Sequence, residues 1–146
     1  MPVKVQVSQV INRPVADVFH FLAVEHVRNH PRWDPDIELW LESDTPIGVG
    51  TVIRRHNSRS GTPIEGTMEV VAYEPNRAFG VEIHDGPVEI RSRITFEPAG
   101  DDRTIVTTFV ELPGMDDESM DKSFLLSRLE ESSTRRKELI ESEIQA

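Results

Sequence analysis

The amino-acid sequence predicts an α+β domain in which a curved antiparallel sheet of about seven strands wraps around one long helix near the C-terminus. Apolar and polar residues alternate in a series of segments, and the segments are separated by the short turns that join antiparallel neighbours. After Pro113 and Gly114 the apolar spacing changes to that of a helix. Strands do not alternate with long helices, so a parallel sheet is not indicated.

The length and composition limit the possible functions. The chain has 146 residues, which suits a single domain over residues 1–146 with one hydrophobic core. Its net charge of −10 disfavours binding to nucleic acid and to anionic membranes. Cysteine is absent, which excludes disulfides, thiolate nucleophiles and cysteine zinc sites. Because no apolar run reaches the length of a membrane span or resembles a signal segment, we expect a cytoplasmic protein without a stable membrane anchor.

The first elements are a strand and a short helix. Alternation of valine with polar residues predicts a strand from the start of the chain to Asn12. A short helix is expected from Arg13 to Leu22, because Pro14 can occupy the first helical position without losing a hydrogen bond.

A second short helix is expected from Glu25 to Asn29. Proline lacks the backbone N–H that a helix needs, so Pro31 should stop this helix directly after His30. Pro31 and Pro35 should then bracket an extended segment.

Further strands are expected wherever alternating segments are bounded by turn-forming residues such as Gly, Pro, Asn and Asp. They are Ile37 to Leu41, Thr51 to Asn57, Glu65 to Tyr73, Ala78 to His84, Val88 to Phe96 and Arg103 to Leu112. The final helix should begin near Asp116, Asp117 and Glu118, whose carboxylates suit a helix N-terminus, and run almost to Ile144.

Strand alternation also assigns the faces of the predicted sheet. One face of the two strands from Ala78 to Phe96 should point inward and carries Phe79, Val81, Ile83, Val88, Ile90, Ser92, Ile94 and Phe96. The other face should point to solvent and carries Glu82, His84, Glu89, Arg91, Arg93 and Glu97.

Several segments together resemble the SRPBCC or START-like superfamily, in its polyketide cyclase/dehydrase-like branch. They are the helix Arg13 to Leu22, His30 to Pro35, Pro46 to Thr51, Tyr73 to Phe79, Phe96 to Gly100 and the long final helix, which together cover nearly the whole chain. The resemblance implies the helix-grip fold, with two short helices after strand one and a hollow between sheet and helix that holds apolar ligands. The side chains that we expect at such a ligand are Trp33, Arg54, His56, Tyr73, Phe79, Val81, Ile90, Ser92, Ile94, Leu129, Ser133 and Arg136.

The strand Val52 to Asn57 carries an arginine on each of its faces. Whichever face is inner, either Arg54 or Arg55 therefore leans toward the hollow, where its guanidinium could hold a carboxylate, phosphate or enolate. The alternatives are a structural pair with Glu65 or Glu69, or a solvated position at the edge of the core.

The final helix has an apolar face that polar residues interrupt. Leu125, Leu129, Ile140 and Ile144 define this face, and Ser133 and Arg136 fall near its middle. A buried arginine must pair with a carboxylate, reach water or meet an anionic ligand, unless the helix has passed the sheet and Arg136 reaches solvent. We expect Ser132, Ser133 and Arg136 to line the polar part of the pocket, facing an arginine or histidine of the strand from Val52 to Asn57.

His26 and His30, followed by Asp34 and Asp36, formally resemble a cluster of metal ligands. The arrangement lacks the glutamate between the histidines that a zinc hydrolase uses, and we expect no metal and no cofactor. The segment from His30 more simply anchors the crossover from helix to sheet, with Trp33 closing one end of the core and Asp34 capping local amides.

Two other aromatic residues have alternative interpretations. Tyr73 could act as an acid or hydrogen-bond donor in a cyclase-like pocket, or it could simply pack at the end of its strand. Trp40 alternates away from the inner residues, so it is either a partly exposed ring or part of a self-association patch. A monomer and a homodimer both remain open.

Three functions are compatible with the sequence. The first is a binding or carrier protein for a small apolar or amphipathic molecule that bears a polar or anionic end. The second is a polyketide cyclase/dehydrase-like enzyme that acts on a ligand in the same hollow. The third is a protein-interaction module similar to the chaperone-cofactor members of the superfamily. A hydrolase has no support, because no serine lies in a nucleophile-elbow motif.

Overall fold

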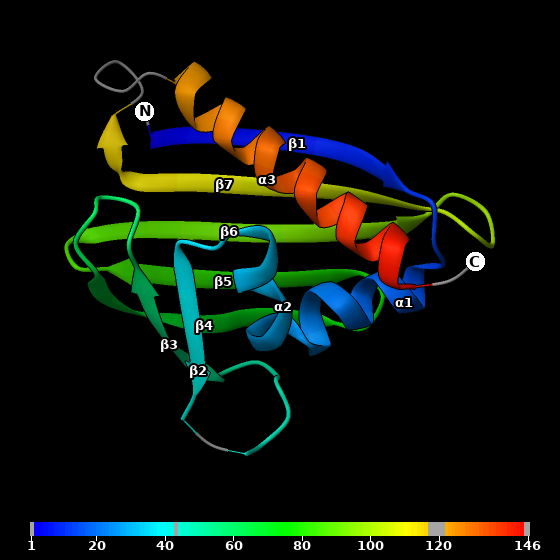
Figure 1. Cartoon of the computed structure of the whole chain (residues 1–146), viewed down its shortest axis with the longest axis horizontal. Helices are drawn as coiled ribbons and strands as arrows, with labels where there is room; N and C mark the ends of the chain where they lie inside the picture. The colour runs from blue at the N-terminus through cyan, green and yellow to red at the C-terminus, as the bar shows by residue number, and fades with distance from the viewer. Residues whose placement is uncertain (1, 43, 117–121, 145–146) are drawn as a thin grey trace.

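The computed structural model describes residues 2–42, 44–116 and 122–144 and contains a curved, antiparallel seven-stranded sheet in the order β1-β7-β6-β5-β4-β3-β2 (Figure 1). The predicted α+β helix-grip fold is confirmed. The strands are β1 (Pro2–Ile11), β2 (Ile37–Leu41), β3 (Val52–Asn57), β4 (Ile64–Glu74), β5 (Ala78–Asp85), β6 (Val88–Pro98) and β7 (Thr104–Asp116).

The helices lie on the concave face of the sheet (Figure 1). They are α1 (Val15–Phe19), the π-helical turn η1 (His20–Val24), α2 (His26–Trp33) and α3 (Lys122–Glu143). The long helix α3 packs against β1, and α2 lies between α3 and β2. None of the helices in the described ranges is long and apolar enough to cross a membrane.

The second short helix is longer than predicted, because α2 continues through Pro31 to Trp33. The expected stop after His30 is therefore wrong, and so is the extended segment expected to start there. The amide of Asp34 still donates to the His30 carbonyl at 3.1 Å and closes the last turn. Helical geometry in this turn buries Trp33 to 3% exposure, and such burial offsets the one hydrogen bond that proline removes.

The last strand is also longer than predicted, since β7 continues through Pro113 and Gly114 to Asp116. Asp116 therefore does not begin the final helix, while Asp117 and Glu118 lie outside the described residues. The pairing of β1 with β7 shifts register between Pro2 and Val3. Such an irregularity accommodates a proline that cannot donate to the ladder.

The hydrophobic core fills the space between the helices and the inner face of the sheet. Phe79, Val81, Ile83, Ile94 and Phe96 are all buried, as the alternation predicts. The inner face of the central strands therefore bounds any site in the interior on one side.

Candidate functional site

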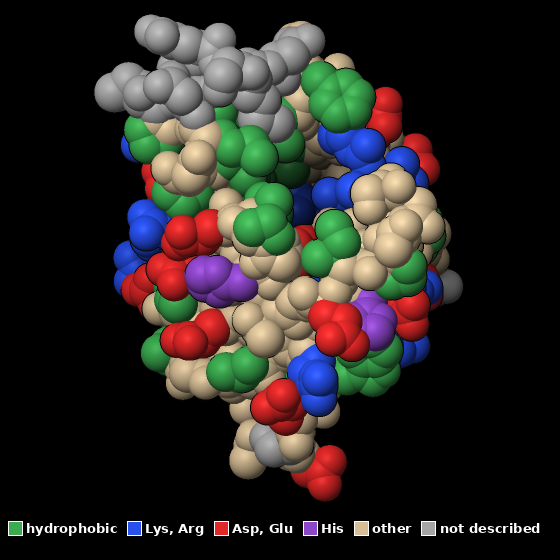
Figure 2. Space-filling view, turned by 90° about the vertical axis from the view of Figure 1, so that its left-hand side faces the viewer, with side chains coloured by type: hydrophobic (Ala, Val, Ile, Leu, Met, Phe, Trp, Pro, Cys, Tyr) green, Lys and Arg blue, Asp and Glu red, His purple; other side chains and the backbone are tan. Residues whose placement is uncertain are grey.

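The space between α3 and the sheet is open at one end. The first three turns of α3 bury none of their side chains, and its buried residues begin at Ser133. Around this end, the inward-facing residues of the sheet and helix are only half-buried; they are Val7, Ile90, Ser92, Val110, Leu125, Leu126 and Leu129. Figure 2 shows a hollow at this end of the molecule, with basic side chains at its edge and inside it. The hollow is thus apolar at its walls and charged at depth.

A small, partly open pocket lies between α2 and the central strands. It has a volume of about 40 Å³ and is lined by His26, His30, Met68, Phe79, Val81, Ile83, Ser92 and Ile94. This space suits a few water molecules or one substituent of a ligand, whereas a pocket for a whole ligand measures roughly 300 Å³ or more. This pocket by itself is therefore too small for a whole ligand.

Arg136 of α3 points into the interior and is 4% exposed. Its Nη2 donates to Gln9 Oε1 at 3.1 Å and to Thr108 Oγ1 at 2.9 Å, while its Nε has no partner. Desolvation by burial lowers the pKa of Arg136 to about 10. No carboxylate among the described residues forms an ion pair with it. Among the described residues, the partners of the buried Arg136 cation are thus neutral groups.

Ser133 lies one turn before Arg136 and is equally buried, and its Oγ also lacks a hydrogen-bond partner. Burial of both residues rules out the alternative in which Arg136 reaches solvent. The partners of Arg136 are Gln9 and Thr108 on β1 and β7, however, and not a residue of β3 as predicted. The two α3 side chains therefore place unused donors in the interior.

Arg55, and not Arg54, is the inward-facing arginine of β3. It is 3% exposed and forms a bidentate pair with Asp85, with Nε–Oδ1 and Nη2–Oδ2 distances of 2.9 and 3.1 Å. Asn57 Nδ2 donates to the same carboxylate at 2.9 Å. The carboxylate comes from β5, and not from Glu65 or Glu69 on the adjacent strand. The Nε and Nη2 groups of Arg55 are therefore already paired with a carboxylate, and its charge is balanced inside the protein.

The prediction that Arg54 and His56 face the hollow is wrong. Arg54 lies on the outer face and forms a 3.8 Å ion pair with Glu42. The His56 ring packs edge-on against Trp40 at 4.6 Å. The register of β3 decides this result, because the fully buried Ile53 fixes the inward face as the one that carries Arg55.

His26 and His30 form a hydrogen-bonded pair inside the molecule. His26 Nδ1 lies 2.9 Å from the Leu22 carbonyl oxygen, and His30 Nδ1 lies 3.1 Å from His26 Nε2. Burial lowers the pKa of His26 to about 4 and that of His30 well below its usual value, and the charges of Arg55 and Arg136 act in the same direction. Both rings are therefore neutral near pH 7.

The sequence does not identify this pair as part of a pocket, because its spacing before Asp34 and Asp36 resembles that of metal ligands. The available signal was the spacing of four residues, which places both rings on one face of a helix. Within the described ranges, no three His, Asp or Glu side chains are grouped as metal ligands. Asp34 is buried beside His30 and pairs with Arg59.

The other predicted ligand residues lie at two depths. Trp33 is buried and stacks on His30 with ring centroids 5.2 Å apart, at one end of the core. Tyr73 packs edge-on against Phe19 and Phe79. Four of them line the small pocket between α2 and the central strands, namely Phe79, Val81, Ser92 and Ile94. Two lie nearer the open end of the hollow, namely Ile90 and Leu129.

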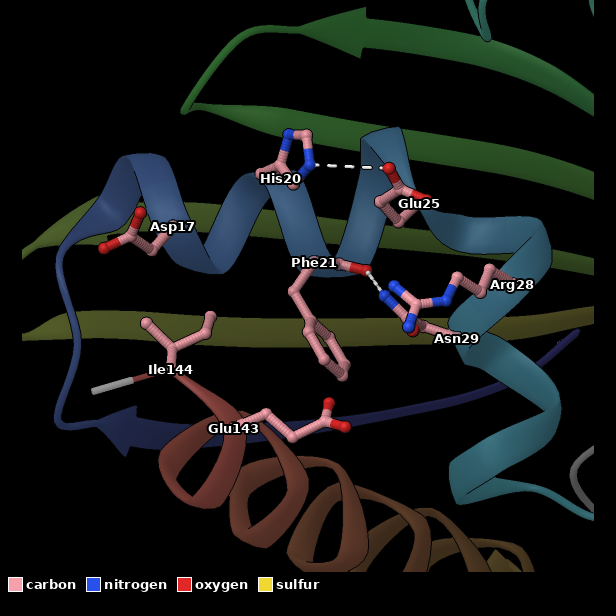
Figure 3. Close-up of a pocket in the computed structure, with 8 residues that line it drawn as sticks. All are labelled: Asp17, His20, Phe21, Glu25, Arg28, Asn29, Glu143 and Ile144. Carbon is pink, nitrogen blue, oxygen red and sulfur yellow. Dashed lines mark hydrogen bonds and ion pairs between the residues drawn. The ribbon is translucent and has the colours of Figure 1, made fainter.

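A second pocket of about 370 Å³ lies at the opposite end of the molecule, between the short helices and the last turn of α3 (Figure 3). Its lining consists of Asp17, His20, Phe21, Glu25, Arg28, Asn29, Glu143 and Ile144. Asn29 donates to the Phe21 carbonyl at 2.9 Å and accepts from Arg32, which pairs with Glu143. The buried polar group of this pocket is thus satisfied, and the pocket's polar lining mixes both signs of charge.

The sequence profile of one protein family matches residues 2–140, which is nearly the whole chain, and the family is described as polyketide cyclase/dehydrase and lipid transport. The chain belongs to this family. No curated protein sequence matches the chain. Membership is consistent with the open hollow between α3 and the sheet.

Solved structures of several proteins share this fold. Ara h 8.0201 superposes with a TM-score of 0.75 at 13% identity, covering 97% of this chain and 99% of that chain. The Zhui aromatase/cyclase from a Streptomyces species gives 0.74 at 14% identity, with 100% and 98% covered. A START superfamily protein from Mycobacterium smegmatis gives 0.74 at 15% identity, with 95% and 97% covered. Identities this low establish a common fold and no common function.

The neutral histidine pair predicts that acid destabilises the protein. Between pH 6.5 and about 4 the unfolded chain binds a proton at His26 that the folded chain excludes, so the free energy of unfolding falls as the pH falls. For His26 alone the loss approaches about 3 kcal/mol over this window. This loss is measured by urea unfolding of the native protein and of the His26→Gln variant at neutral and at acidic pH. The variant keeps a donor for Leu22 and an acceptor for His30, and its stability should fall less steeply; equal slopes would contradict the assignment.

Proposed function

We propose that this family member binds a small amphipathic molecule, with the anionic end of the ligand at Arg136 and Ser133 and its apolar body in the hollow. The observation that carries the proposal is the burial of Arg136 without a carboxylate partner in the described chain. Family membership supports a ligand-binding or cyclase-type role in general terms.

The energetic argument starts from the cost of burying a charge. A buried guanidinium without an opposite charge is unfavourable by several kcal/mol, and hydrogen bonds to Gln9 and Thr108 offset only part of this cost. A carboxylate or similar anion would supply the missing charge and accept from Arg136 Nε and Ser133 Oγ. Charge-assisted hydrogen bonds of this kind are the strong ones in protein interiors.

The apolar part of the ligand has a matching surface. Half-buried Ile90 and Leu129 form the walls at the open end of the hollow, and buried Phe79 and Ile94 line the small pocket beside α2. The ligand body would displace water from the hollow, and the small pocket of about 40 Å³ would accept one substituent. Because Arg136 Nε and Ser133 Oγ are themselves buried, the side chains that cover them must move for the anionic end of the ligand to reach them.

Replacing Arg136 by leucine tests the proposal. The Arg136→Leu variant should bind naphthoic acid about 1.5–3 kcal/mol more weakly than the native protein, because the charge-assisted hydrogen bonds are lost. Its affinity for neutral methyl naphthoate should change much less. Calorimetric titration measures both, and Arg54→Leu, on the outer face of β3, is the control that should change neither. Equal losses for acid and ester would contradict the proposal.

A second candidate function is catalysis, and the histidine pair is the observation that favours it. A neutral imidazole can accept a proton from a bound substrate, but the lowered pKa of these rings makes them weak bases, so the substrate group must be acidic. Mass spectrometry of a ligand recovered after incubation separates the two functions, since a carrier returns the ligand unchanged.

A protein-interaction module would instead use exposed apolar side chains such as Phe124, and it should bind neither naphthoic acid nor methyl naphthoate.

A further inference from the structure

The hydrogen bonds of the histidine pair fix which nitrogen carries each proton. A carbonyl oxygen only accepts, so the Nδ1 of His26 must donate to Leu22. Because His26 is neutral, its Nε2 is then an acceptor, and the Nδ1 of His30 must donate to it. His30 is neutral as well, so its own Nε2 carries no proton. The pair therefore ends in a bare acceptor nitrogen.

This nitrogen has no donor among the residues that the structure describes. The charged group beside it is the Asp34 carboxylate, with Oδ2 at 3.9 Å, which is itself an acceptor. The neighbouring arginines are already engaged, Arg59 with Asp34 and Arg55 with Asp85. The His30 side chain lines the small pocket and remains 14% exposed, and its Nε2 is not among the fully buried polar atoms without a partner. A molecule in the pocket can therefore reach this nitrogen.

The interior thus presents two unlike polar features. On α3, Arg136 Nε and Ser133 Oγ lack partners, and the guanidinium offers a donor without an acceptor. On α2, His30 Nε2 is an acceptor without a donor. Arg136 Nη2 binds Thr108, which pairs in the sheet with Ile94, and Ile94 lines the same pocket as His30. Because neighbouring strands lie about 5 Å apart, one small molecule can span both features. Apart from the two histidines, the small pocket between α2 and the strands is lined mainly by apolar side chains.

We propose that the ligand is a hydroxy acid. Its hydroxyl group lies in the small pocket between α2 and the central strands and donates to His30 Nε2, while its carboxylate lies at Arg136 and Ser133. The carboxylate half of this assignment rests on the proposed function, and the hydroxyl half rests on the histidine pair. A site built to pair with a hydroxyl discriminates against the analogue without it, because its own polar atom is then left without a partner.

A panel of naphthoic acids tests the hydroxyl half. Calorimetry should compare unsubstituted naphthoic acid with hydroxynaphthoic acids that carry the hydroxyl at each other ring position. At least one hydroxy isomer should bind about 3- to 10-fold more tightly than the unsubstituted acid, which is the range for one net hydrogen bond. The His30→Phe variant keeps the ring that stacks on Trp33, and in this variant the preferred hydroxy acid should bind no more tightly than the unsubstituted acid. His20→Phe, at the exposed opposite end, is the control and should retain the advantage.

Nitrogen NMR of the imidazoles provides a readout that does not depend on any variant. Near neutral pH both rings should show protonated Nδ1 and bare Nε2, and the His30 Nε2 signal should shift when the preferred hydroxy acid binds. A proton on His30 Nε2, or no gain for any isomer, would overturn the proposal. If unsubstituted naphthoic acid still binds through Arg136, the proposed function survives that result. If no acid binds while the bare nitrogen is observed, the proposed function fails and with it the hydroxy-acid assignment.

Discussion

Replacing Asp85 by alanine is expected to lower the free energy of unfolding by about 3–5 kcal/mol, because it leaves the buried guanidinium of Arg55 without its carboxylate. Arg55 is 3% exposed, so water cannot replace the lost partner without opening the sheet. Asn57 would also lose the acceptor for its side-chain amide. Urea unfolding followed by circular dichroism measures the change.

Two controls distinguish the buried pair from an ordinary charge effect. Glu42→Ala removes the partner of Arg54, the neighbouring residue on β3, and should cost less than about 1 kcal/mol because that pair is exposed. Adding Arg55→Met to the Asp85→Ala variant should recover much of the stability, because the unpaired charge is then gone. Similar losses for Asp85→Ala and Glu42→Ala, or no recovery in the double variant, would contradict this account of Arg55.

Replacing Gly66 by alanine is expected to destabilise the protein by about 3 kcal/mol or more, because the added methyl group has no room. Its carbon would lie 2.2 Å from the His84 backbone oxygen and 2.6 Å from Asp85 Oδ1. Gly66 lies on β4 directly between Arg55 and Asp85 in the sheet register. The absence of a side chain there lets an arginine on β3 reach a carboxylate on β5.

The matched control is Gly48→Ala, because a methyl group at Gly48 meets nothing within 4 Å. Its stability should change by no more than about 1 kcal/mol, with a small gain possible from reduced entropy of the unfolded chain. Thermal unfolding of both variants measures the difference. If Gly66→Ala were as stable as Gly48→Ala, the close approach of Arg55 and Asp85 across β4 would have to be abandoned.

The sequence determined the elements of the sheet and the identity of the inner face. Period-2 alternation from Phe79 to Ile83 is a local property of the chain, and it predicts burial without knowledge of the neighbouring strands. For Arg136, its place among Leu129, Ile140 and Ile144 on one helix face left two alternatives, burial or a position past the sheet in solvent, and the structure shows burial. Local patterns were misleading at Pro31, because the burial of Trp33 favours a helix that proline alone disfavours.

The tertiary structure decided the polar contacts of the site. Both faces of β3 carry an arginine, and only the register with β4 selected Arg55 over Arg54 for the interior. Its partner Asp85 is two strands away, a pairing that no sequence spacing encodes. The spacing of His26 and His30 placed them on one face, but their neutrality follows from burial and from the charges of Arg55 and Arg136, which distant segments supply. Sequence periodicity reports which face of an element is buried, whereas the protonation and pairing of buried groups depend on side chains that only folding brings together.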